Sequence, residues 1–121
     1  MSGELQTVAL LDNVSAVLGS NLSLACSSTA KPILCLWKTP YGHVYTLSEG
    51  VFAESGRLRH EVPLEISGQG CGILIAGVEA RDQGDWQCEV GGIVTDAFET
   101  DTSVITVEVK SKFINSILSF L

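Results

Sequence analysis

Four cysteines constrain the fold of this 121-residue chain more than any other feature. They stand at Cys26, Cys35, Cys71 and Cys88, with no C-x-x-C pair and only two histidines in the chain, so their spacing does not suit a zinc site. Cysteines this far apart suit disulfides between distant strands. Trp37 lies between the outermost two, eleven residues after the first. The pattern predicts an oxidised domain with disulfides and a tryptophan in its core.

The hydrophobic pattern predicts many short strands. Leu22, Leu24 and Cys26 alternate with polar or small residues, which is typical of a half-buried strand. Ile33, Cys35 and Trp37 are expected on the inward face of the next strand. Further predictions are a turn at residues 39–42, a strand at 43–47, an inward face made of Cys71, Ile73 and Ile75, and a last strand at 102–109.

The residues around the last cysteine give these strands a family resemblance. The run from Asp82 to Cys88 closes a Cys…Trp…Cys order, and with it residues 5–110 resemble the immunoglobulin superfamily, variable or intermediate type. The resemblance implies an all-β fold, an immunoglobulin-like β-sandwich of two antiparallel sheets. It also implies a disulfide between the sheets from Cys26 to Cys88, with Trp37 packed against it.

The chain departs from the family pattern at two places. Trp86 stands where the family has a tyrosine two residues before the second cysteine, and an indole offers one N–H donor instead of a hydroxyl. Residues 99–104 contain no glycine, so the glycine bulge of antigen-receptor domains is missing. We therefore do not expect an antibody or T-cell receptor domain.

The two remaining cysteines predict a second bridge. Cys35 is two residues before Trp37 and Cys71 is two residues before Ile73, so both side chains should point into the sandwich from opposing sheets. Four cysteines allow three pairings, and two buried thiols are the alternative to this bridge. Cys35 in the strand of Trp37, together with the glycines around Cys71, gives the chain a resemblance to the amino-terminal immunoglobulin domain of fasciclin III-type neural adhesion proteins of invertebrates.

The ends of the chain are expected to lie outside the domain. Residues 1–4 form an N-terminal extension without the charged and apolar regions of a signal peptide. Residues 111–121 form an apolar tail that is either a short helix or a linker. No apolar stretch is long enough to cross a membrane, so we expect membrane attachment only through other parts of a parent chain.

Charge and sequons indicate the compartment and exclude some partners. The net charge of −7 opposes binding to nucleic acid or to anionic lipid, because both require clustered Lys and Arg. Asn13 and Asn21 each begin an N-x-Ser sequon and are predicted glycosylation sites. Together with the oxidised cysteines, they favour an extracellular location.

A candidate partner-binding face follows from the strand that holds Trp37. If Cys35 and Trp37 point inward, Leu34 and Leu36 point outward from the centre of a sheet. The alternative is that the chain itself, near Val51, or an adjacent domain covers them. The residues predicted to form this face are Leu34, Leu36, Lys38, Tyr45, Leu47, Gln87, Glu89 and Phe98.

The remaining charged and polar residues suggest structural roles. Arg57 or Arg59 is expected to pair with Asp82, as immunoglobulin domains often tie this corner. The loop expected at residues 92–100 is acidic, but it lacks the D-x-D-x-D-G sequence motif of a calcium-binding loop, so no metal site is predicted. His43 and His60 are not part of any triad or phosphate-loop motif, so we expect neither an enzyme, a cofactor nor a small-molecule substrate.

Three functions remain open at this point. The first is a cell-surface adhesion module that binds itself or another immunoglobulin-type protein through the predicted face. The second is a secreted immune-type binder that uses its loop tips, at residues 29–31 and 92–100. The third is a spacer domain in a multi-domain array. Outward apolar residues on the sheet favour the first.

Overall fold

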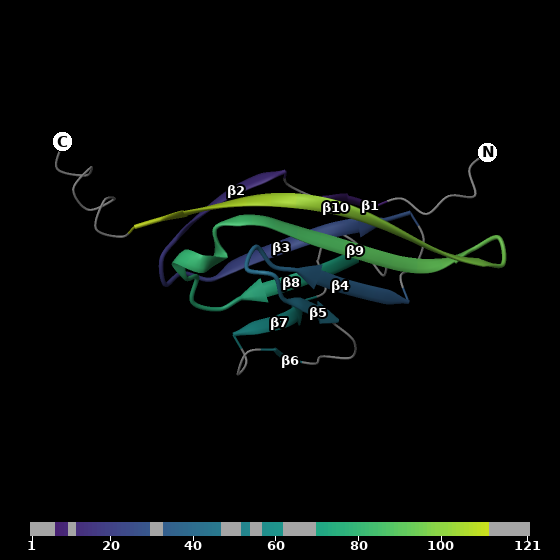
Figure 1. The fold of residues 1–121 in the computed structure, drawn as a ribbon, viewed down its shortest axis with the longest axis horizontal. Coiled ribbons are helices and arrows are strands. Elements are labelled where there is room, and N and C mark those ends of the chain that lie inside the picture. Colours follow the sequence, from purple (N-terminus) through teal and green to yellow (C-terminus); the bar gives the residue numbers. More distant parts are fainter. Residues whose placement is uncertain are drawn as a thin grey trace.

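The chain folds into two β-sheets packed face to face (Figure 1). The computed structural model describes residues 7–9, 12–29, 33–46, 52–53, 57–61 and 70–111. The first sheet has the order β1 (Thr7–Ala9), β3 (Leu22–Ser28), β8 (Gly70–Ile75), β7 (Leu58–Glu61) and β6 (Phe52–Ala53). The second has the order β2 (Asn13–Val17), β10 (Ala97–Lys110), β9 (Gly84–Val94), β4 (Leu34–Lys38) and β5 (Val44–Thr46).

The predicted fold class is confirmed, an immunoglobulin-like β-sandwich with two disulfides. One detail differs from the prediction of two antiparallel sheets. β2 pairs with β10 in parallel, from Asn13 opposite Thr106 to Val17 opposite Lys110. β1 pairs with β3 in the first sheet, so the N-terminal part of the chain contributes a strand to each sheet.

Alternating side chains from both sheets fill the core. Leu24 and Cys26 of β3 and Trp37 of β4 are buried while their neighbours along the strand are less so, as the period of two requires. Ile33 is an exception. It precedes β4 and is 66% exposed, so the prediction that it points inward is wrong. The other large core residues are Leu58, Ile73, Ile75, Val78, Trp86, Val90, Ile105 and Val107.

Both predicted disulfides are present, and each joins the two sheets. Cys26 of β3 bonds to Cys88 of β9, and Cys35 of β4 bonds to Cys71 of β8. Cys26 lies directly opposite Cys71 in the first sheet, and Trp37 lies opposite Cys88 in the second. The two bridges are therefore neighbours in the core, beside the tryptophan.

The corner before β9 is organised by Asp82, which is fully buried at the end of the 3-10 helix η1 (Ala80–Asp82). Arg57 donates from Nη1 to Asp82 Oδ2 at 2.8 Å and from Nη2 to Oδ1 at 3.0 Å, so Arg57 is the arginine that pairs with Asp82. These bonds raise the pKa of the Arg57 guanidinium above its usual value. Arg59 is exposed on β7.

Trp86 replaces the missing corner tyrosine. Its side chain is fully buried, and its indole N–H donates to the backbone carbonyl of Asp82 at 2.8 Å. The family's tyrosine bonds to backbone a few residues upstream, and Trp86 makes the same kind of link four residues back. Tyr41 packs edge-on against the indole ring and accepts a bond from Arg57 at its hydroxyl.

β9 and β10 form one long hairpin that extends past the other strands (Figure 1). The sequence predicted a loop at residues 92–100 and a last strand beginning only at 102. Instead β10 begins at Ala97, and only Thr95 and Asp96 form the turn. Both have a positive φ, 51° and 64°, as a tight two-residue hairpin turn requires, and aspartate tolerates this conformation well.

Candidate protein-binding surface

The outer face of the second sheet carries most of the predicted partner-binding residues. Strand register places them in rows across β4, β9 and β10: Leu34 with Gly91 and Thr100, Leu36 with Glu89 and Thr102, and Lys38 with Gln87 and Val104. Ile93 and Phe98 face each other beyond the end of β4. Of the residues predicted to form this face, Leu34, Leu36, Lys38, Gln87, Glu89 and Phe98 lie on it.

Two predicted residues do not belong to the described face. Tyr45 lies opposite Trp37, so its side chain is on the core-facing side of β5, where it packs against the core. Its hydroxyl is 2.9 Å from His43 Nδ1. Tyr45 was wrongly predicted to point outward, because laterally paired residues of a sheet share a face and its partner Trp37 points into the core. Leu47 lies outside the described residues.

An apolar cluster occupies the hairpin end of the outer face. Phe98 is 52% exposed and Ile93 55% exposed, whereas Leu34 is half-buried. The Phe98 ring lies over Gly91: a Cβ placed on that glycine would be 2.5 Å from Phe98 Cζ and 3.2 Å from Leu34 Cβ. One side of the ring is therefore held by backbone and by leucine while the rest faces solvent. We call Leu34, Gly91, Ile93 and Phe98 the hairpin cluster.

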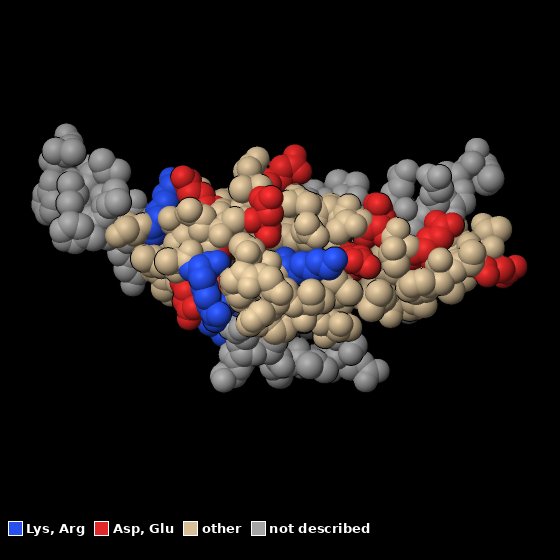
Figure 2. All heavy atoms as spheres, viewed as in Figure 1, with Lys and Arg blue, Asp and Glu red and all other residues tan. Residues whose placement is uncertain are grey.

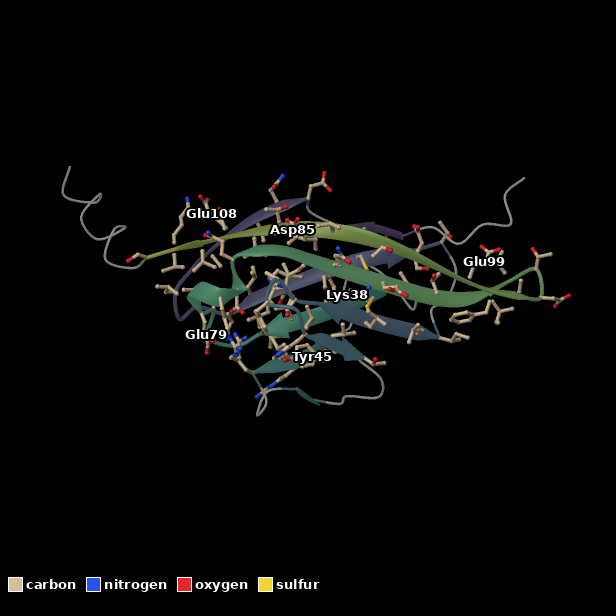
Figure 3. The ribbon with its side chains drawn as sticks, in the orientation of Figure 1. Lys38, Tyr45, Glu79, Asp85, Glu99 and Glu108 are labelled. Atoms are coloured by element: carbon tan, nitrogen blue, oxygen red, sulfur yellow. A yellow bond between two sulfur atoms is a disulfide. The ribbon has the colours of Figure 1, made fainter. Side chains whose placement is uncertain are left out.

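The middle of the outer face is polar. Lys38 Nζ lies 3.7 Å from Glu89 Oε1 in a partly exposed ion pair, and Lys38 is near the centre of the view in Figure 3. Leu36, expected to be a main contact residue, is only half-exposed beside Glu89. The most exposed apolar side chains of the outer face, Ile93 and Phe98, therefore lie near the hairpin turn and not at the sheet centre, where Leu36 was expected to be exposed.

The end of the outer face far from the hairpin tip has a shallow hollow. It encloses about 220 Å³ between Lys38, His43, Val44, Asp85 and Gln87. Asp85 accepts a hydrogen bond from the Thr106 hydroxyl at 2.8 Å, so it braces β9 against β10. Val104 is exposed next to Gln87 and was not among the residues predicted on this face. Its position directly before the buried Ile105 in the strand indicates that it points outward.

The two predicted glycosylation sites lie in different places. Asn13 is exposed at the start of β2, on the edge of the second sheet. Asn21 is exposed just before β3, and its Oδ1 accepts a hydrogen bond from the Gly77 N–H at 3.1 Å. Because Asn13 belongs to the same sheet as the hairpin cluster, a glycan there would stand beside the outer face.

No metal or membrane site emerges from the described residues. Within them, Cys26, Cys71 and Cys88 are the one group of potential ligands close enough to share an ion, and all three sulfurs are bound in disulfides. Glu99, expected in the acidic loop, and Asp101, expected near it, are half-buried on β10 instead. The described part of the chain has no helix long and apolar enough to span a bilayer.

The chain matches no protein-family model, and no curated protein is similar to it. Two disulfides between packed sheets fit a domain of an oxidising, extracellular-type environment.

Proposed function

We propose that this chain is an extracellular recognition domain of the immunoglobulin type that binds another protein, either a second copy or a related domain, through the outer face of β4, β9 and β10. The observation that supports this most is the Phe98 ring, held over Gly91 and Leu34 while about half its surface is exposed. An aromatic ring that is already ordered loses little side-chain entropy on binding, and such residues dominate interface energies.

The surroundings of the ring support the same function. Ile93 extends the apolar surface on one side, and the Lys38–Glu89 pair supplies a polar border on the other. Protein interfaces commonly combine an apolar centre with a polar rim. The alternative of a binder that uses loop tips loses support, because residues 92–100 are mostly paired strand. An enzymatic role is not proposed.

The narrower parts of the proposal concern family and location. Membership of the immunoglobulin superfamily is supported by the Cys26–Cys88 bridge beside Trp37 and by the strand order. The likeness to fasciclin III-type adhesion domains depends on the second cysteine pair alone. Cell-surface adhesion is the role that fits an immunoglobulin-type fold, disulfides of an extracellular type and a protein-binding face.

Sedimentation velocity over a concentration series, up to about 100 μM, tests the proposal. Ile93→Glu places a charge in the hairpin cluster without touching the core, and Ala80→Glu adds the same charge at an exposed site in η1, at the other end of the molecule. We expect wild type and Ala80→Glu to associate, and Ile93→Glu to remain monomeric with an unchanged melting temperature. Equal association of both variants would contradict the proposal, as would a monomeric wild type that binds no related domain.

A further inference from the structure

The two disulfides lie close enough together for the sulfurs of one to reach the other. The sulfurs of Cys26, Cys71 and Cys88 all lie within 4.8 Å of one another, although Cys71 belongs to a different bridge from the other two. Disulfides rearrange when a thiolate attacks a sulfur of another disulfide, and proximity is the first requirement for that attack. A thiolate released at Cys71 would already lie beside the Cys26–Cys88 bridge.

Strand register shows that Cys26 and Cys71 can form a bridge with each other. They lie directly opposite on the antiparallel strands β3 and β8, and both are fully buried in the core. The Cα atoms of directly opposite residues are about 4.5–5.5 Å apart in an antiparallel pair, and disulfides span Cα separations of about 4.4–6.8 Å. The backbone can therefore accommodate this alternative bridge without a change of strand register.

The alternative bridge differs from both observed bridges in the strands that it joins. Cys26–Cys88 and Cys35–Cys71 each connect the first sheet to the second. A Cys26–Cys71 bridge would connect two neighbouring strands of the first sheet. Exchange to this bridge would therefore leave the two sheets without a disulfide between them.

Cys35 is the residue at which an external thiol can start this exchange. It is 9% exposed, whereas the other three cysteines have no exposed surface. Acidic side chains are spread over the face of the molecule in view in Figure 2, and the chain has a formal net charge of −7. Such a surface repels anions, so a neutral or cationic thiol should react faster than an anionic one.

We propose that the two bridges form a disulfide relay, in which a small neutral or cationic thiol that opens Cys35–Cys71 also breaks Cys26–Cys88. In the first step the thiolate bonds to the Cys35 sulfur, the Cys35–Cys71 bond breaks, and Cys71 leaves as a thiolate. In the second step the Cys71 sulfur bonds to Cys26, and Cys88 leaves as a thiolate that takes up a proton.

The relay needs no oxidant, because the numbers of disulfides and of thiols are the same before and after. The external thiol ends as a mixed disulfide on Cys35, and Cys88 becomes the free thiol. The inference goes beyond the proposed function, because it concerns the covalent links between the sheets and not the outer face. It predicts that one thiol molecule uncouples both sheets.

Two cysteine variants test the second step without an external thiol. Cys35→Ala leaves Cys71 as a free thiol within reach of the Cys26–Cys88 bridge. Cys71→Ala is the matched control, because it leaves Cys35 as the free thiol, and Cys35 is not one of the three clustered sulfurs. Both folded variants are incubated at about pH 8, where a thiol is partly ionised, and free thiols are then blocked with an alkylating reagent.

Non-reducing peptide mapping then shows which cysteines are joined. Trypsin cleaves after Lys38 and Arg81, so Cys26, Cys71 and Cys88 fall in separate peptides. We expect the fraction of Cys26 that has left Cys88 to be at least about tenfold larger in Cys35→Ala than in Cys71→Ala.

Cysteamine, a small cationic thiol, tests the whole relay on the wild-type domain and decides the question if the variants do not fold. The protein is treated under native conditions, alkylated and mapped in the same way. We expect cysteamine on Cys35, a Cys26–Cys71 linked peptide and an alkylated Cys88. Glutathione, which is anionic, should give the same products more slowly.

Four results would overturn the proposal. In the variants, it is an equal fraction of displaced Cys26 in both. In the wild type, the first is cysteamine on Cys35 while Cys26–Cys88 stays intact, because the two bridges then react independently. The second is cysteamine on Cys71 with a free Cys35, and the third is a folded domain that does not react with cysteamine.

Discussion

Replacing Trp86 by phenylalanine tests whether its indole N–H performs the structural task of the corner tyrosine. Trp37 offers a matched control, because both tryptophans are fully buried and Trp37→Phe removes the same atoms. Among the described residues, the Trp37 N–H has no hydrogen-bond partner, whereas the Trp86 N–H donates to Asp82 O. Trp86→Phe loses a buried hydrogen bond, whereas Trp37→Phe removes a buried donor that has no partner, so both effects should make Trp86→Phe the less stable variant.

The expected magnitudes follow from the two environments. The smaller ring should cost about 1–2 kcal/mol at either site, since large-to-small changes in a core leave unfilled space. Trp86→Phe additionally removes the donor from a buried carbonyl, which costs about 1–2 kcal/mol more. In a domain of this size, that extra cost lowers the melting temperature by a further ~4–8 °C.

Urea and thermal unfolding of the disulfide-intact proteins measure this difference. We expect Trp86→Phe to be the less stable variant, and Trp86→Tyr to recover part of the loss if its hydroxyl reaches backbone. Equal stability of Trp86→Phe and Trp37→Phe would refute the reasoning. It would mean that the corner is held by the packing of the ring and by the Arg57–Asp82 pair alone.

Two further predictions concern charge and glycosylation. Arg57→Met should destabilise the domain by about 3–5 kcal/mol, because it leaves the Asp82 carboxylate buried without its partner. Arg59 is exposed on β7, two residues after Arg57, and Arg59→Met should change the free energy of unfolding by no more than about 0.5 kcal/mol in the same urea titration. Similar losses of stability in both variants would argue against a special role of the Arg57–Asp82 pair. Asn21 should carry a glycan after secretion from a eukaryotic host, because it is exposed and begins a sequon. Intact mass before and after enzymatic deglycosylation checks this, and an unchanged mass would contradict it.

The resemblance to the immunoglobulin pattern predicted the Cys26–Cys88 bridge, and residue spacing predicted the Cys35–Cys71 bridge. Cys35 lies two residues before Trp37, and that spacing alone places both on one face of β4. The same parity correctly placed Leu34 and Leu36 on the opposite face. Local periodicity carries this information, so no knowledge of the rest of the chain is needed.

The extent to which neighbouring strands bury each outward side chain could not be predicted in the same way. Leu34 was expected to be exposed, yet it is half-buried, and both Leu34 and the Phe98 ring lie close to Gly91. That contact joins different strands and depends on register, which no local pattern states. Gly91 was a possible signal, since a glycine inside a strand often marks a close approach by another group.

The outward position of Phe98 depends on a feature that the sequence did contain. Burial of Ile105 fixes the inward face of β10, and the register with β9 then continues without interruption to Ala97, so a residue seven positions earlier must point outward. A bulge between them would have turned Phe98 toward the core. The missing glycine bulge in residues 99–104, which separated this chain from antigen-receptor domains, is therefore also what allows the ring to reach Gly91 on the outer face. Continuous pairing between β9 and β10 therefore produces the hairpin cluster, and the proposed interaction through the outer face depends on it.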